Sequence, residues 1–269
     1  MAATCPINFD VESLRAQVQA EYDRVAREPH GDFHFHRGAD YAHEYLYYTR
    51  EDLNRVPTLA SDRFAGVGNP HRIGPLYPGE VVLDHACGAG MDVIIAAHRV
   101  GPTGKVIGVD MTPTMRDCAL EAAREAGVAG RVDVRAGFYE ELPVADDSVD
   151  VVISNGVINL APDKNRVFRE IHRVLRPGGR LLMADVVVAR ELKLEARSNP
   201  DIWAACIGGA LPEWELPELA AAAGFRNGRV TEHFECFRNT SAERKVSKDL
   251  RVHGVNFFAN KQYEIYYSP

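Results

Sequence analysis

The stretch VVLDHACGAGMD, residues 81–92, places an apolar run directly before a glycine-rich turn. The aliphatic residues at its start are typical of a buried strand. Gly88 and Gly90 then supply a backbone without side chains, which can approach a ligand closely where a strand turns into a helix. The apolar residues that follow, MDVIIAAHRV at 91–100, indicate that helix. The stretch therefore predicts a strand, a ligand-binding turn and a helix in succession.

The alternation of strand and helix continues along the chain. Apolar runs of strand length recur at 105–111, 131–137, 147–155 and 180–188. Helical patterns stand between them at 112–127 and 163–175, and we expect a turn at RPGG, 176–179, before the last of these strands. Such alternation implies an α/β fold with a doubly wound, mostly parallel sheet.

The last part of the chain has a different pattern. Residues 212–225, PEWELPELAAAAGF, indicate a helix. RVTEHFECF at 229–237 and VHGVNFFANK at 252–261 are typical of strands, and we expect them to form an antiparallel pair.

The first part of the chain stands apart from the alternating region. Residues 11–27 carry apolar side chains at helical spacing, and a segment rich in histidine and aromatic residues follows. Residues 65–79 hold four glycines and three prolines, which mark a loop or boundary. We expect an N-terminal helical and aromatic lid, on the substrate side, over 1–70 and the ligand-binding domain over 71–269.

The bulk composition narrows the function classes. The 269 residues have a net charge of −7 and no block of Lys or Arg, which argues against nucleic-acid binding. No apolar run approaches the roughly 20 residues needed to cross a bilayer, and no secretory signal is visible, so we expect a cytoplasmic enzyme. The five cysteines are scattered without a CxxC pair, so we expect neither a disulfide framework nor a bound metal.

The residues around the glycine turn also indicate the cofactor. Asp110 follows Gly90 by twenty residues at the end of the next expected strand, where a carboxylate can accept hydrogen bonds from two ribose hydroxyls. Both a dinucleotide and S-adenosylmethionine fit this arrangement. The third glycine of the dinucleotide fingerprint is replaced by Val93, and Asp92 adds a negative charge near the helix start. That charge suits a sulfonium or amino group better than pyrophosphate, which favours S-adenosylmethionine.

Several motifs in combination resemble a known family. VVLDHACGAGMD, VIGVDMT, ELPVADDSVDVVISN and VFREIHRVLRPGGRLLMAD are similar to the successive motifs of class I S-adenosylmethionine-dependent methyltransferases, over about residues 80–190. VGPTGKVIGVDMT, SVDVVISNGVINLAPDK and DIWAACIGGALPE resemble, more narrowly, the arsenite methyltransferases, over most of 65–260. The resemblance implies a seven-strand Rossmann-like sheet and S-adenosylmethionine as cofactor.

The resemblance also implies roles for single residues. Asp84, Gly88 and Gly90 would line the methionine part of the cofactor, Asp110 its ribose and Met111 its adenine. Ala86 stands where the family has the first glycine of the loop. Phe138 and Tyr139 stand where many members of the family have an acidic residue near the adenine, so this contact would come from the backbone or from Glu140. Asn155 and Val157 would lie beside the methyl-bearing sulfur.

The methyl acceptor is harder to infer, because the family's cysteine pattern is incomplete. Arsenite methyltransferases hold arsenic with cysteine thiolates at three places, of which this chain keeps Cys206. Gly156 replaces the second, and residues 28–80 contain no cysteine. One thiolate cannot form a multi-sulfur clamp. We therefore expect Gly156 to line a substrate pocket for a small soft nucleophile, most simply a small thiol. Arsenite bound through Cys206 with atypical partners, and O-, N- or C-methylation of a small metabolite, remain alternatives.

The N-terminal segment adds further candidates. His34 and His36 in DFHFHRG could touch the substrate or accept a proton near pH 7, and with Cys206 they are the catalytic candidates. Tyr48, among several nearby tyrosines, could help to close an aromatic lid over the sulfonium. The expected partner is a small-molecule substrate, bound by a monomer or homodimer.

Overall fold

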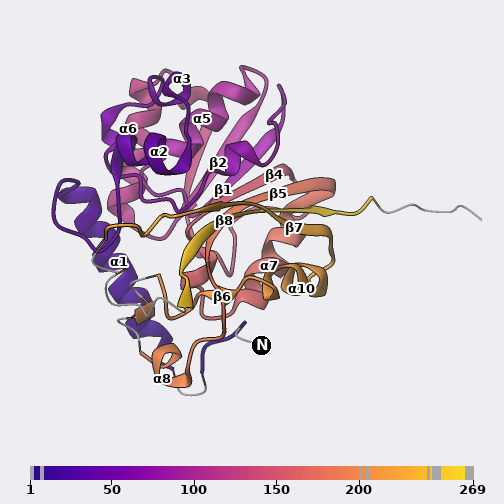
Figure 1. Ribbon diagram of the computed structural model, residues 1–269. Helices are drawn as coiled ribbons and strands as arrows, with labels where there is room; N and C mark the ends of the chain where they lie inside the picture. The colour runs from indigo at the N-terminus through magenta and orange to yellow at the C-terminus, as the bar shows by residue number, and fades with distance from the viewer. Residues whose placement is uncertain are drawn as a thin grey trace, which may run out of the picture.

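The structure is a computed structural model, and it describes residues 3–6, 9–199, 202–203, 206–240, 243 and 250–263. Figure 1 shows the arrangement of its helices and strands. The longer helices are α1 (Val11–Arg27), α2 (Gly38–Leu46), α5 (Met91–Val100), α6 (Pro113–Glu125), α7 (Lys164–Val174) and α10 (Glu215–Ala222). Among the residues described, α3 (Arg50–Leu53), α4 (Thr58–Ser61) and α8 (Leu194–Arg197) are α-helices of a single turn. Within the described ranges, no helix is long and apolar enough to cross a membrane.

The sheet has the order β3-β2-β1-β4-β5-β8-β7, with β6 paired to β5. Its strands are β1 (Val81–His85), β2 (Lys105–Asp110), β3 (Val132–Ala136), β4 (Val149–Asn155), β5 (Leu175–Val188), β6 (Leu211–Pro212), β7 (Phe225–Phe234) and β8 (His253–Lys261). Strands β1 to β6 pair in parallel, whereas β8 runs antiparallel to both β5 and β7. This arrangement confirms the doubly wound, mostly parallel sheet and its antiparallel last pair.

The sheet is covered on both faces because its central strands are apolar on both sides. Alternate residues of each strand enter different clusters. Val82 and Ile153 pack in the cluster that contains α5, whereas Leu83 and Val152 pack in the cluster that contains α7 and α10. The carboxyl ends of the parallel strands are left for loops.

The structure moves the strand expected at 229–237 to β7, which begins at Phe225 within the expected helix, and it changes two further elements. The RPGG segment, expected as a turn, is part of β5, which begins at Leu175. A register shift absorbs the extra residues, since Val149 pairs with Leu175 while Val151 already pairs with Arg180. The short strand β6 was not expected, because two residues are too few to show a period.

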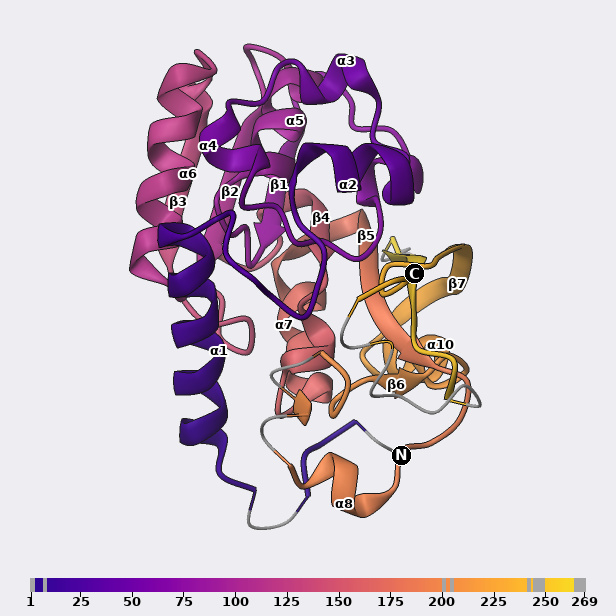
Figure 2. The same cartoon turned by 60° about the vertical axis from the view of Figure 1, so that its left-hand side comes forward.

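The N-terminal segment packs into the same cluster as α5. Asp10 caps α1 by accepting a hydrogen bond from the Ser13 N–H at 2.9 Å. Figure 2 shows α2, α3 and α4 grouped near α5, with α1 extending away from this group. Leu46 and Phe64 are buried in one cluster with residues of α5. This packing brings the loop after α4 to the carboxyl ends of β1 and β4.

Candidate functional site

A cavity lies at the carboxyl ends of β1, β2 and β4, where α/β sheets bind ligands. It spans about 890 Å³, including its open mouth. Many residues expected at the cofactor or substrate line it. These are Asp84, Ala86, Gly88, Gly90, Asp110, Met111, Tyr139, Asn155, Gly156 and Val157.

The turn after β1 has a backbone that favours glycine. Gly88 has φ 52° and Gly90 has φ 90°, both in the left-handed region. A Cβ at Gly90 would lie 3.0 Å from the Cβ of Ala119, so a side chain there would force α5 and α6 apart. Ala86 adopts φ 66° despite its Cβ, which is the strain that the family's glycine avoids. The turn thus presents bare backbone to the cavity.

Asp110 is held in one orientation at the end of β2. Its Oδ2 accepts a hydrogen bond from the Gly88 N–H at 2.9 Å, and its Oδ1 accepts one from the Thr112 N–H at 2.8 Å. Burial raises the pKa of this carboxyl, while the two backbone hydrogen bonds oppose that rise. Each oxygen keeps a further lone pair for ligand hydroxyls.

Three carboxylates give the cavity an anionic character. Asp84, Asp92 and Asp110 all line it, and each is less than a tenth exposed. Burial raises the pKa of Asp84 well above its usual range, and the charges of Asp92 and Asp110 raise it further. A cationic ligand would relieve this repulsion. The donor set therefore fits S-adenosylmethionine, which carries a sulfonium and an ammonium group.

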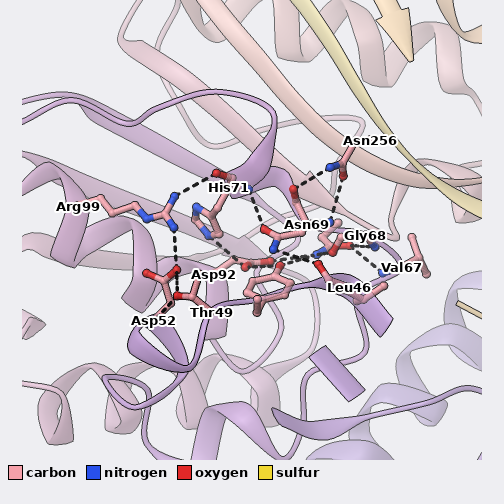
Figure 3. A network of polar contacts seen from close by, with 12 residues as sticks. Leu46, Thr49, Asp52, Val67, Gly68, Asn69, His71, Asp92, Arg99 and Asn256 are labelled. Atoms are coloured by element: carbon pink, nitrogen blue, oxygen red, sulfur yellow. Dashed lines mark hydrogen bonds and ion pairs between the residues drawn. The ribbon is translucent and has the colours of Figure 1, made fainter. Parts of the chain in front are cut away.

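A polar network behind the cavity wall fixes Asp92 (Figure 3). Its Oδ1 accepts a hydrogen bond from the Tyr48 hydroxyl at 2.8 Å, and its Oδ2 accepts one from Asn155 Nδ2 at 3.2 Å. The His71 Nε2 lies 3.2 Å from Asp92 Oδ1, with both side chains buried. Tyr48 is thus behind the wall rather than in it, where it positions Asp92.

The loop from Arg63 to Gly66 lines the cavity but was not expected there from the sequence. The Val67 N–H donates to Asn155 Oδ1 at 2.8 Å, which ties the loop to the end of β4. A Cβ at Gly66 would lie only 2.4 Å from Asn155 Nδ2, so the loop can approach only because residue 66 is glycine. The glycines of this segment, interpreted above as a boundary, were the signal of that close approach.

The two expected adenine neighbours are placed differently. Tyr139 lines the cavity and donates a hydrogen bond from its hydroxyl to the Leu160 carbonyl at 3.3 Å. Phe138 is 46% exposed and is not among the lining residues. Its ring instead lies 5.0 Å from the Arg15 guanidinium, whose side chain also pairs with Glu140 at 2.5 Å.

Cys206 is buried but does not line the cavity. It adopts φ 63°, a left-handed backbone uncommon for a residue with a side chain. Burial raises the pKa of its thiol to about 12, and the charge of Asp185 contributes to that rise. The thiol is therefore protonated at neutral pH in this arrangement.

His34 and His36 lie in a separate surface hollow with Arg24 and Asn239. The His36 ring packs 5.1 Å from the ring of Tyr41, and its Nε2 donates to the Arg238 carbonyl at 2.7 Å. His34 Nδ1 lies 3.7 Å from Glu21 Oε1. Neither histidine is brought together with the cavity residues.

The comparisons with known proteins agree on one family. Residues 76–236 match the family described as the methyltransferase domain. An arsenite methyltransferase of Halobacterium salinarum is 45% identical over 210 residues, which cover 77% of this chain and 53% of that protein. An arsenite methyltransferase of Homo sapiens is 34% identical over 219 residues, which cover 77% of this chain and 57% of that protein. The chain thus spans somewhat more than half the length of these curated relatives.

A solved structure extends this similarity to three dimensions. The arsenic(III) S-adenosylmethionine methyltransferase of Chlamydomonas reinhardtii is 36% identical and matches with a TM-score of 0.68. The match covers 79% of this chain and 72% of that chain. The chain belongs to the methyltransferase-domain family, and within it the chain is similar to the arsenite methyltransferases.

Proposed function

We propose that the chain transfers a methyl group from S-adenosylmethionine to a small soft nucleophile, a small thiol. When bound, S-adenosylmethionine would supply an electrophilic methyl group. An acceptor that has lost its thiol proton to solvent would bond to the methyl carbon as the carbon–sulfonium bond breaks, which leaves S-adenosylhomocysteine and a methyl thioether. Asp84 and the glycine turn would hold the methionine part, and the fixed carboxylate of Asp110 would hold the ribose. Asn155 and Val157 would border the reacting sulfur.

The acceptor side of the proposal depends on the cavity wall at Gly156. Of the described cysteines, only Cys87 lines the cavity, and burial raises the pKa of its thiol well above the usual range. Gly156, at the position of a family thiolate, provides no thiolate at that part of the wall. Since the cavity offers no pair of thiolates, the nucleophile is proposed to come from the acceptor itself. The protein then contributes positioning and the exclusion of water.

Arsenite is the second candidate acceptor, and the curated relatives favour it. Those proteins are named arsenite methyltransferases, and this chain keeps Cys206 of their cysteine pattern. Cys206 and Cys236 are buried in one apolar cluster, and the charge of a Cys206 thiolate would raise the pKa of Cys236. These two thiols could replace part of the missing clamp.

An acceptor panel distinguishes the candidates. Purified protein and S-adenosylmethionine labelled in the methyl group would be incubated with small thiols, with arsenite, and with phenols and amines. We expect label to enter thiols, unchanged in the Cys206→Ser variant. Arsenic methylation that Cys206→Ser abolishes would favour the second candidate instead. Turnover of phenols or amines alone would contradict both, and calorimetry without S-adenosylmethionine binding would contradict methyl transfer altogether.

A further inference from the structure

Two histidines and a glutamate converge near the carboxyl end of β5, where β6 and β8 pair with it. Glu213 follows β6, His233 belongs to β7, and His253 begins β8. The Glu213 Oε2 lies 3.0 Å from His233 Nε2 and 3.4 Å from His253 Nε2. One ligand atom from each side chain lies within 4.8 Å of the other two. None of the three lines the cavity.

The register of the sheet explains why these side chains meet. His253 pairs with Val187 of β5, and His233 pairs with Val255 of β8. His233 and His253 are therefore diagonal neighbours on one face of the antiparallel pair. Their rings lie 5.2 Å apart.

Glu213 reaches the same face from the other side of β5. Leu211 of β6 also pairs with Val187, and Glu213 stands two residues further on. Its N–H donates to the Val188 carbonyl at 3.2 Å, which fixes its backbone to the sheet. All three backbones are thus anchored in hydrogen-bonded sheet structure, a rigid support for ligands.

The hydrogen bonding of His253 indicates what lies between the three groups. Its Nδ1 lies 2.8 Å from the Arg251 carbonyl, which can only accept, so Nδ1 carries the proton. The other ring nitrogen, Nε2, faces the Glu213 Oε2 at 3.4 Å, and a carboxylate oxygen only accepts. A cation between the two would satisfy both. Donation from the second ring nitrogen to a carbonyl is also the usual support of a metal-bound histidine.

We propose that Glu213, His233 and His253 bind a divalent transition-metal ion, with zinc as the best fit. Two imidazoles and one carboxylate match a zinc site that keeps an open position. Tetrahedral zinc with these ligands needs ligand atoms about 3.4 Å apart, close to the spacing of the carboxylate to each histidine. Each ligand is twenty residues from the next in the sequence, so the spacing does not match a known metal-binding motif.

The ion would tie together the two ends of the connection between β7 and β8. Cys236 and Phe237, at the start of that connection, are buried in the cluster that also holds Cys206. The Arg238 carbonyl accepts the hydrogen bond from His36. Metal binding is therefore expected to stabilise the contact between this connection and the N-terminal segment.

The test is a metal titration of the full chain without an affinity tag, after treatment with a chelator. We expect one equivalent of Zn²⁺ to bind in competition with a chromophoric chelator, and to raise the melting temperature. The variants Glu213→Gln and His233→Gln should each weaken binding by at least about tenfold. His30→Gln is the matched control, because His30 is exposed and pairs with Asp62 instead.

The spectrum of bound Co²⁺ distinguishes binding at this site from binding to cysteine thiolates. Co²⁺ should give a visible spectrum without the sulfur-to-metal charge-transfer band of thiolate ligation, and His233→Gln should remove it. Retained binding in the double variant His233→Gln/His253→Gln, or a thiolate band in the wild type, would overturn the proposal. So would the absence of any stoichiometric binding to the folded wild type. Circular dichroism of each variant establishes that a loss of binding is not a loss of fold.

Discussion

The hydroxyl of Tyr48 donates a hydrogen bond to the carboxylate of Asp92 at 2.8 Å, joining the N-terminal segment to the first turn of α5. Tyr48 is 1% exposed and Asp92 is 6% exposed. Because Asp92 lines the cavity, this bond makes the orientation of a cavity carboxylate depend on the segment that precedes the sheet.

Removal of that hydroxyl should loosen both the fold and the site. In Tyr48→Phe, Asp92 Oδ1 loses a hydrogen bond, and bonds to charged groups contribute about 1.5–3 kcal/mol. We expect the free energy of unfolding to fall by a similar amount in urea titrations, and S-adenosylmethionine affinity to fall in calorimetry. Tyr47→Phe is the control, since Tyr47 is 53% exposed. Equal effects of both substitutions would contradict the role given to Tyr48.

Asp84 should make the ligand-free protein less stable at higher pH. Its pKa is raised in the folded state, so the fold keeps a proton that the unfolded chain has already released. The free energy of unfolding therefore falls as the pH rises from about 4, the usual pKa of Asp, through the raised value. Asp84→Asn should lack this fall, which urea titrations at a series of pH values would measure.

The same substitution should weaken cofactor binding. A carboxylate facing a cation makes the stronger, charge-assisted kind of hydrogen bond, and its loss should reduce S-adenosylmethionine affinity about tenfold or more. Asp117→Asn, at an exposed position of α6, is the control. A variant that is both more stable at high pH and unchanged in affinity would place the cofactor elsewhere.

Lys164 should give stability the opposite pH dependence. Its side chain is fully buried, and its Nζ donates to the Ala161 carbonyl at 2.8 Å. Burial lowers the pKa of this amine from 10.5 to about 7, although the charge of Asp185 opposes the change. Between these two values the unfolded chain binds a proton that the folded protein does not. The free energy of unfolding should therefore rise with pH across this range, by a few kcal/mol.

Lys164→Met isolates that contribution. Methionine has a similar volume and no charge, so the difference in unfolding free energy between wild type and variant should shrink or reverse as the pH rises from 7 toward 10.5. Subtraction of the two curves cancels tyrosine and cysteine ionisations common to both. A difference that is flat with pH would mean that Lys164 stays protonated in the fold.

The parts of the site that could be predicted from the sequence are those built from contiguous residues. Asp84, Gly88 and Gly90 belong to one strand and turn, and Asp110 ends the next strand. Apolar period and glycine spacing are local signals, so these residues and the mostly parallel sheet could be predicted from them. The antiparallel strands β7 and β8 were expected for the same reason.

What the sequence did not indicate depends on contacts between distant segments. The loop at Gly66 reaches the cavity through Asn155, and Tyr48 reaches Asp92 from the connection between α2 and α3. These contacts depend on tertiary packing between segments that are distant in the chain, and such packing produces no periodic pattern in the sequence. Glu213 and His253 meet only through the register of β5 with its neighbours. Cys206, selected by resemblance, proved to be buried outside the cavity.

Substitution of Gly156 tests both the backbone conformation at this position and the place at which the acceptor binds. Its φ of 76° lies in the left-handed region, where a side chain costs about 1–2 kcal/mol. A Cβ there would meet Val67 at 3.5 Å, an ordinary contact, so Gly156→Ala should lose stability through the backbone and not through a clash. Gly130→Ala is the control, because Gly130 has no neighbour within 4 Å and no positive φ, and it should change little.

The same variant distinguishes an effect on acceptor binding from an effect on cofactor binding. Its added methyl group would occupy the cavity wall at which the acceptor is proposed to bind. We expect Gly156→Ala to raise the KM for the thiol acceptor several-fold more than it weakens S-adenosylmethionine binding, as steady-state kinetics and calorimetry would show. An unchanged acceptor KM would mean that the acceptor does not contact this wall. The replacement of a family thiolate by glycine would then reflect the backbone requirement at position 156 and not a change of substrate.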